Sequence, residues 1–186
     1  EKSRYIMQNT SLPVISLTKS IFEYVFVRIT GSFAEVEALL KINATFIAVD
    51  GTYRIRGKQY TGPDYIKKIK KMYPKILVMA DIATSQEAFA CYEAGADCIS
   101  TTLCGYTPDT VFDTQEYPSF SLLEECIKFV PRDFTIMAEG RFNKPEYAAQ
   151  AIENGAWAVI VGTSITRPQI ITRWYVNAIK KKVGQI

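Results

Sequence analysis

Amphipathic and apolar stretches alternate along this 186-residue chain in a repeating order. Three times an amphipathic stretch leads into a Gly-Ala or Asn-Ala pair and then into a short apolar run, with the runs at 46–50, 98–102 and 159–162. Apolar residues spaced three or four apart predict a helix, and Gly or Asn tolerates the left-handed conformation that commonly ends one. Each repeat is therefore predicted to be a helix, a turn and a strand.

The same alternation extends over the rest of the chain. Apolar runs of strand length lie at 14–17, 46–49, 76–79, 98–103, 134–138 and 158–161. Helical stretches are predicted near 33–42, 63–72, 85–94, 119–129, 145–154 and 168–181, and residues 4–9 resemble the end of a further helix. Pro63, Pro145 and Pro168 suit a first helical turn, and Thr84 or Ser85 suits an N-cap.

Strands that alternate with helices predict a parallel sheet. A polar residue follows nearly every strand, in the order Lys19, Asp50, Asp81, Thr102, Glu139 and Thr163. A barrel brings such ends to one catalytic rim, whereas an open doubly wound sheet places its ligand at a single crevice. The α/β class and a (β/α)8 TIM barrel, as a single domain over 1–186, are therefore favoured. Because a closed barrel needs eight strand-helix units, we expect two of them to be missing before Glu1.

Composition narrows the chemistry. Apolar residues make up 48% of the chain, and the net charge of +3 is spread along it except at 180–182, which suits the end of a helix better than a nucleic-acid site. No apolar stretch is long enough to span a bilayer. The four cysteines form no C-x-x-C pair and histidine is absent, so we expect no metal and a reduced, cytoplasmic setting. Proton chemistry must then use Lys, Asp, Glu, Tyr or Cys.

The loop after the last strand has the features of a phosphate site. Gly162 leaves backbone N–H groups open, Thr163 adds a hydroxyl, and Arg167 precedes a predicted helix. Barrels often bind phosphate after their seventh and eighth strands, and an arginine can add a bidentate contact. An ordinary turn with a surface arginine is the alternative.

Several other strand ends carry candidates for proton chemistry or substrate binding. Glu139 is expected to be partly buried and Gly140 to permit close approach of a ligand, although Glu139 could instead pair with Arg141. Lys19 at the mouth of an apolar cavity could serve as a base, or it could be a solvated surface lysine. Asp81 could hold a substrate hydroxyl or amide, or cap the next helix. The same two roles are possible for Asp50, which also has Arg54 and Arg56 as possible partners.

Six motifs, one per strand, resemble the N-acetylmannosamine-6-phosphate 2-epimerase family. They are PVISLTK at 13–19, IAVDGT at 47–52, VMADIAT at 78–84, TTLCGYT at 101–107, MAEGR at 137–141 and VGTSITRP at 161–168. The resemblance runs from about residue 12 to the C-terminal helix. It implies a (β/α)8 barrel that interconverts the 6-phosphates of N-acetylmannosamine and N-acetylglucosamine without a cofactor.

The resemblance also implies roles for residues. Lys19 matches the family's acid/base lysine, Glu139 its partner carboxylate and Asp81 a substrate-binding aspartate. The matching motifs make four more residues candidates for substrate binding: Thr102, Tyr106, Asp50 and Arg54. The phosphate grip is expected at Gly140, Arg141, Gly162, Thr163 and Arg167. The implied partner is a phosphorylated N-acetyl amino sugar, and a homodimer is the commonest assembly.

Two other hypotheses remain open. Another phosphosugar isomerase or a phosphate-binding synthase could use the same barrel and phosphate loop. A degenerate homologue could also bind a phosphosugar without turning it over, because residues 20–28 are apolar and aromatic where the family has a polar loop, and Ser16 replaces a usual glycine.

Overall fold

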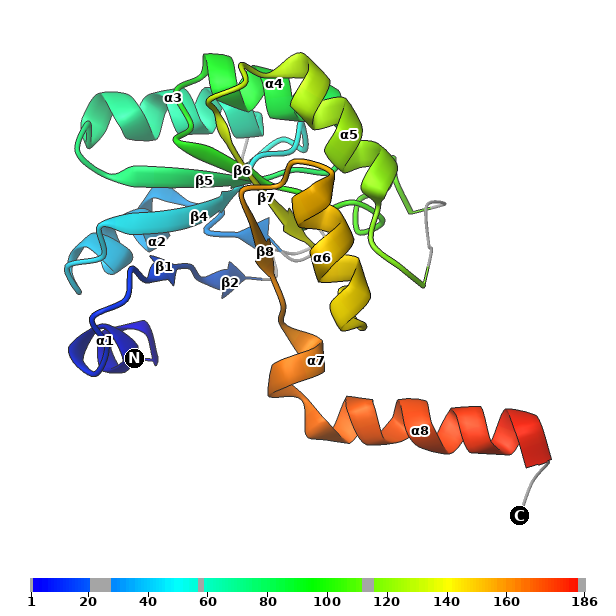
Figure 1. The fold of residues 1–186 in the computed structure, drawn as a ribbon. Coiled ribbons are helices and arrows are strands. Elements are labelled where there is room, and N and C mark those ends of the chain that lie inside the picture. Colours follow the sequence, from blue (N-terminus) through cyan, green and yellow to red (C-terminus); the bar gives the residue numbers. More distant parts are fainter. Residues whose placement is uncertain (1, 21–27, 57–58, 112–115, 184–186) are drawn as a thin grey trace.

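The computed structural model describes residues 2–20, 28–56, 59–111 and 116–183, so most of the apolar 20–28 segment lies outside the described residues. The centre of the fold is a six-stranded parallel sheet in the order β1-β4-β5-β6-β7-β8, curled into part of a barrel (Figure 1). Its strands are β1 Ile15–Ser16, β4 Phe46–Asp50, β5 Leu77–Asp81, β6 Cys98–Ser100, β7 Thr135–Glu139 and β8 Ala158–Ile160. The α/β class and the barrel architecture are thereby confirmed, and the one-domain boundary of 1–186 stays a prediction.

Five helices follow strands and pack on one face of the sheet. They are α2 Phe33–Leu40, α3 Gly62–Met72, α4 Ser85–Glu93, α5 Phe120–Phe129 and α6 Pro145–Glu153. Their starts follow the expected chemistry, since Thr61 and Thr84 cap α3 and α4 in capping boxes and Pro145 opens α6. Thr84, and not Asp81, is therefore the cap of α4.

Alternation along the strands separates two apolar clusters. The larger one joins the outward residues of the strands, such as Ile47, Val78 and Ile99, to the buried faces of the helices. The smaller one lines the inner face and includes Ala48, Met79 and Met137. Successive side chains of a strand point to opposite faces, so β4, β5, β6, β7 and β8 each contribute to both clusters.

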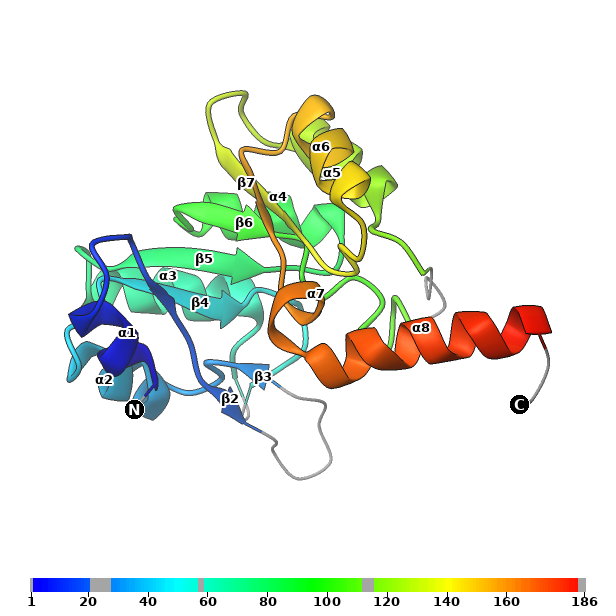
Figure 2. The same ribbon diagram turned by 60° about the horizontal axis from the view of Figure 1, so that its bottom comes forward.

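The remaining elements lie outside this frame. A short antiparallel hairpin pairs β2 Lys19–Ser20 with β3 Arg28–Ile29. The helix expected to end near residue 9 is α1 Lys2–Gln8, and the short α7 Thr163–Thr166 precedes α8 Pro168–Val183. In Figures 1 and 2, α8 projects away from the sheet, and none of its residues is buried. The lysines at 180–182 form its exposed last turn, as expected.

Candidate active site

The candidate acids lie at the carboxyl ends of β4, β5 and β7, and β6 lies between the last two. Asp50 is opposite Asp81 in the β4–β5 register, and Asp81 is opposite Ser100 in the β5–β6 register. Two-residue periodicity places Asp50, Asp81 and Glu139 on the inner face, because each is two residues beyond an inner-face residue of its strand. The sequence expectation of one shared rim therefore holds for these carboxylates.

Asp81 and Glu139 meet through hydroxyl groups. Thr102 Oγ1 lies 2.8 Å from Asp81 Oδ1 and 2.9 Å from Glu139 Oε2. Ser100 Oγ lies 2.7 Å from Thr102 Oγ1 and 3.1 Å from Glu139 Oε2. Asp81 and Ser100 are buried, whereas Thr102 and Glu139 are half-buried and mark the open side of this hydroxyl–carboxylate cluster.

Burial dominates the electrostatics of Asp81. It raises the pKa of the Asp81 carboxyl well above its ordinary value, and the nearby charges of Glu139 and Asp50 raise it further. The Thr102 hydroxyl and the Lys19 ammonium act in the opposite direction. A protonated Asp81 can donate a hydrogen bond, which an ionised one cannot do.

Lys19 lies on the same side of the molecule as this cluster. Lys19 is exposed and belongs to β2 of the hairpin. The sequence placed it at the end of the first strand, and the structure corrects that position. Its ammonium is near enough to Asp81 to lower the pKa of that carboxyl. Lys19 pairs across the hairpin with Ile29, which packs in the inner-face cluster, but among the described residues it forms no hydrogen bond or ion pair with Asp81 or Glu139.

Asp50 and Arg54 form a buried network beside the cluster. Arg54 Nη2 lies 2.7 Å from Asp50 Oδ2, and Arg56 Nη2 lies 3.1 Å from Asp50 Oδ1. Thr52 donates to Asp50 Oδ1 through its hydroxyl at 2.6 Å and its backbone N–H at 3.0 Å. The expected pairing of Asp50 with both arginines is confirmed. Direct contact of Asp50 and Arg54 with a substrate stays a prediction.

Gly140 and Arg141 turn the chain sharply after β7. Both have left-handed backbone angles, with φ of 105° and 59°, and glycine adopts this region without strain. Arg141 Nε donates to the Tyr117 carbonyl oxygen at 3.2 Å, and its guanidinium carbon lies 5.9 Å from the centre of the exposed Tyr106 ring. Among the described residues, Glu139 and Arg141 form no ion pair. The alternative that Glu139 only pairs with Arg141 is therefore not supported.

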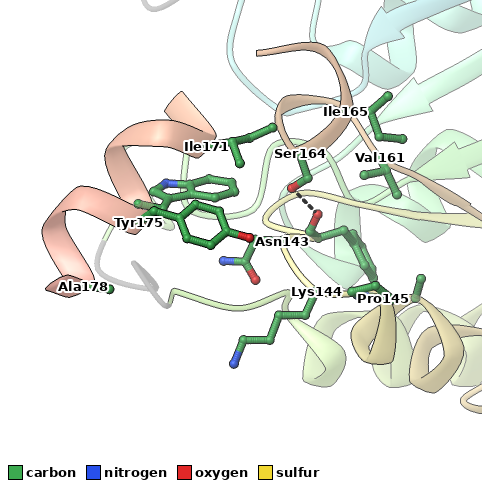
Figure 3. A pocket seen from close by; sticks show the side chains of 12 residues that line it. Asn143, Lys144, Pro145, Val161, Ser164, Ile165, Ile171, Tyr175 and Ala178 are labelled. Atoms are coloured by element: carbon green, nitrogen blue, oxygen red, sulfur yellow. Dashed lines mark hydrogen bonds between the residues drawn. The ribbon is translucent and has the colours of Figure 1, made fainter. Parts of the chain in front are cut away.

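The predicted phosphate loop lies beside an open cavity. Thr163 begins α7 instead of ending a strand, and the exposed Arg167 directly precedes α8. A cavity of about 590 Å³ lies between this loop, the start of α6 and α8 (Figure 3). The Ser164 hydroxyl donates to the Phe142 carbonyl oxygen at 2.8 Å and joins the loops after β7 and β8. The hydroxyl–carboxylate cluster does not line this mainly apolar cavity.

Sequence reasoning missed three residues that organise the site. Ser100 belongs to the hydroxyl–carboxylate cluster, and its spacing of two from Thr102 could have placed both hydroxyls on one face. Thr101 Oγ1 bonds the backbone of Glu139 on both sides, at 3.0 Å from its N and 2.9 Å from its O. Glu87 accepts from the backbone N–H groups of Tyr53 and Ala83, each at 2.8 Å, and so joins the loops after β4 and β5.

The described ranges contain no metal site and no membrane-spanning helix. No group of three or more potential ligand side chains there is placed to hold a metal ion. None of the helices described combines the length and apolar character needed to cross a bilayer. The four cysteines, Cys91, Cys98, Cys104 and Cys126, are buried and free, as expected for small core residues.

Comparison with known proteins gives consistent matches over nearly the whole chain. Residues 2–181 match the family described as "Putative N-acetylmannosamine-6-phosphate epimerase". One relative is described as "Putative N-acetylmannosamine-6-phosphate 2-epimerase" and comes from Caldanaerobacter subterraneus subsp. tengcongensis. It is 42% identical over 177 residues, which cover 95% of this chain and 73% of the relative. One from Clostridioides difficile is 41% identical over 175 residues, covering 94% and 76%.

A solved structure agrees with these sequence matches. The N-acetylmannosamine-6-phosphate 2-epimerase from Clostridium perfringens superposes with a TM-score of 0.84 at 36% identity. The superposition covers 94% of this chain and 74% of that protein. Sequence and fold therefore point to the same group of proteins.

Proposed function

The chain belongs to the N-acetylmannosamine-6-phosphate epimerase family, and we propose that it interconverts N-acetylmannosamine 6-phosphate and N-acetylglucosamine 6-phosphate by moving the proton on C2. In this proposal it is an N-acylglucosamine-6-phosphate 2-epimerase of amino-sugar catabolism. The observation that carries the proposal is the Asp81–Thr102–Glu139 cluster at one rim of the sheet, with Lys19 on the hairpin whose Ile29 packs in the inner-face cluster.

The reaction chemistry suits these groups. In the open-chain sugar the C2 proton is next to the C1 aldehyde, so its removal gives an enediolate, and reprotonation on the other face inverts C2. An uncharged Lys19 amine takes the C2 proton in this scheme. The step also needs stabilisation of the negative charge that develops on O1. Protonated Asp81 and the hydroxyl groups beside it are the donors available at this rim.

Glu139 is assigned to proton exchange with the sugar hydroxyl groups, including ring opening. It is half-buried, and Thr101 fixes its backbone, so its carboxylate stays oriented toward the rim. Thr102 and Tyr106 are assigned to contacts with the sugar and its acetamido group. Asp50 and Arg54 support that side of the rim through their ion pair.

The phosphate is assigned to the loops after β7 and β8. Gly162 has open space where a side chain would begin, since no atom lies within 4 Å of an ideal Cβ there. The left-handed Gly140 likewise exposes backbone. Thr163, Arg141 and Arg167 add a hydroxyl and two cations, and arginine suits bidentate contact with phosphate.

We also propose a cytoplasmic location and a homodimeric assembly. Free, buried cysteines fit a reducing cytoplasm, and none of the residues assigned above calls for a cofactor. Homodimers are the commonest closed assemblies, and α8 exposes Trp174, Tyr175 and Ile179. Light scattering after size exclusion tests this part, and a monomer at micromolar concentration would contradict it.

Turnover by paired variants tests the assigned roles. We expect Lys19→Ala and Glu139→Ala each to abolish epimerisation of N-acetylmannosamine 6-phosphate while far-UV circular dichroism stays unchanged. Lys180→Ala, in the exposed last turn of α8, is the matched control and should retain full activity. Turnover retained by either site variant would remove its assigned role. A folded wild-type chain that acts only on another sugar phosphate would contradict the substrate assignment.

A further inference from the structure

The hydroxyl–carboxylate cluster has more hydrogen-bonding contacts than its hydroxyl protons can fill. Four oxygen–oxygen contacts of 2.7–3.1 Å join Ser100, Thr102, Asp81 and Glu139. Each hydroxyl donates one proton, and an ionised carboxylate donates none. If both carboxylates were ionised, Thr102 could donate to only one of them, and the other would face the hydroxyl oxygen without a proton between them.

We propose that Asp81 and Glu139 share a single proton through Thr102, with Asp81 as its resting place. Asp81 then donates to Thr102 Oγ1, and Thr102 donates to Glu139 Oε2. Ser100 donates its one proton to Thr102 or to Glu139 and fills a third contact, so one of its two contacts is left without a proton. Ser100 is a positioning residue in this arrangement, because it acts through the groups it contacts, whereas Thr102 carries the proton between the two carboxyl groups.

The surroundings of the two carboxyl groups favour this placement of the proton. Asp81 is 1% exposed, whereas Glu139 is half-buried at the open side, and an ionised group in water costs less than one in a buried site. Burial and the charges of Glu139 on β7 and Asp50 on β4 raise the pKa of Asp81, and only Thr102 and Lys19 on β2 oppose them. Cys98 on β6 also faces Asp81, and its own pKa is raised.

A shared proton would let Glu139 change roles without exchange with water. When the Asp81 proton moves to Thr102 Oγ1, the proton of Thr102 passes to Glu139 Oε2. One O–H bond forms and one breaks at the Thr102 oxygen, and the total number of protons is unchanged. Glu139 thereby changes from a base to an acid. This consequence rests on the proposed function, because opening a sugar ring requires one proton to be taken from a hydroxyl and one to be given to the ring oxygen.

Infrared spectroscopy of the chain without substrate tests the shared proton directly. At about pH 8 ordinary carboxyl groups are ionised, so a carbonyl band of a protonated carboxylic acid, shifted in deuterium oxide, reports a group like Asp81. We expect wild type to show this band and Asp81→Asn to lose it. A wild-type spectrum without the band, or a band that survives Asp81→Asn and disappears in Glu139→Gln, overturns the proposal. The measurement uses no substrate, so it stands even if the proposed reaction is wrong.

Variants of Thr102 test the connection between the two groups. Thr102→Val keeps the shape and removes the hydroxyl, so the band should move to higher frequency, while Thr102→Ser should restore the wild-type position. In turnover, the acid limb of kcat/KM should move in Thr102→Val and return to its wild-type position in Thr102→Ser, because the hydroxyl link between the two carboxyl groups is lost and then restored. An unmoved band and an unmoved limb in Thr102→Val would show that Thr102 only fills space.

Discussion

Gly62 lies where the start of α3 meets the loop after β4, and this contact positions the backbone that follows Asp50. Its backbone N–H donates to the Thr52 carbonyl oxygen at 2.7 Å. An ideal Cβ on Gly62 would lie 2.6 Å from that oxygen and closer still to the carbonyl group of Gly51. Both neighbours are backbone, so no side-chain rotation can relieve the contact. Gly62→Ala must therefore move the loop that follows Asp50.

The expected cost of Gly62→Ala can be built from three contributions. Overpacking of a closely packed site costs about 1–3 kcal/mol, and loss of the hydrogen bond to Thr52 adds about 1 kcal/mol. The better helix propensity of alanine offsets up to about 1 kcal/mol. The net loss of about 2–3 kcal/mol corresponds to a fall in Tm of roughly 5–10 °C for a domain of this size.

Thermal and urea unfolding followed by circular dichroism measure this loss, with Gly162→Ala as the matched control. At Gly162 no atom lies within 4 Å of an ideal Cβ, so its Tm should stay within about 1–2 °C of wild type. A Gly62→Ala chain as stable as Gly162→Ala would refute the reasoning, because it would show that the loop after β4 moves away from α3 at little cost.

Three further predictions concern buried groups. Asp50→Ala leaves Arg56 buried without its carboxylate partner and should lower the free energy of unfolding by about 3–5 kcal/mol. A loss below about 1 kcal/mol in urea unfolding would show that Arg56 reaches water. The folded state raises the pKa of Asp81 above its ordinary value of 3.8 and so binds more protons than the unfolded state. The free energy of unfolding should therefore decline as pH rises from the ordinary aspartate pKa toward the raised pKa of Asp81. Urea unfolding of Asp81→Asn should lack this decline. An unchanged pH dependence in that variant would contradict the burial of the Asp81 carboxyl. Burial raises the pKa of Cys98 and Cys126 to about 12, so a thiol reagent should label them near pH 8 only after unfolding, and rapid labelling of the native chain would contradict their burial.

The regular part of the fold could be predicted because its signals are local. Apolar runs bounded by Gly, Asn or Pro marked the six parallel strands, and Thr84, Pro63 and Pro145 marked helix starts that the structure confirms. The β2–β3 hairpin was missed because its two-residue strands are mostly polar and do not stand out as apolar runs. The four-residue α7 was missed because it is too short for its periodicity to be visible. The direction of α8 depends on tertiary packing, which periodicity does not report.

The candidate site could be predicted as a set of strand ends but not as a network. A parallel sheet brings Asp81 and Glu139 to one edge, and this followed from the alternation of strands and helices. Ser100 was treated as part of an apolar strand, so its contact with Thr102 was missed. Which oxygen atoms approach within hydrogen-bonding distance depends on register and rotamers. The sequence fixes neither of these by pattern alone.

The most direct test of the proposed activity is proton NMR of the full chain with N-acetylmannosamine 6-phosphate in deuterium oxide. We expect N-acetylglucosamine 6-phosphate to appear with deuterium at C2, because the C2 proton is removed by a base and replaced from solvent-exchanged groups. A folded chain that yields neither the epimer nor C2 exchange would contradict it.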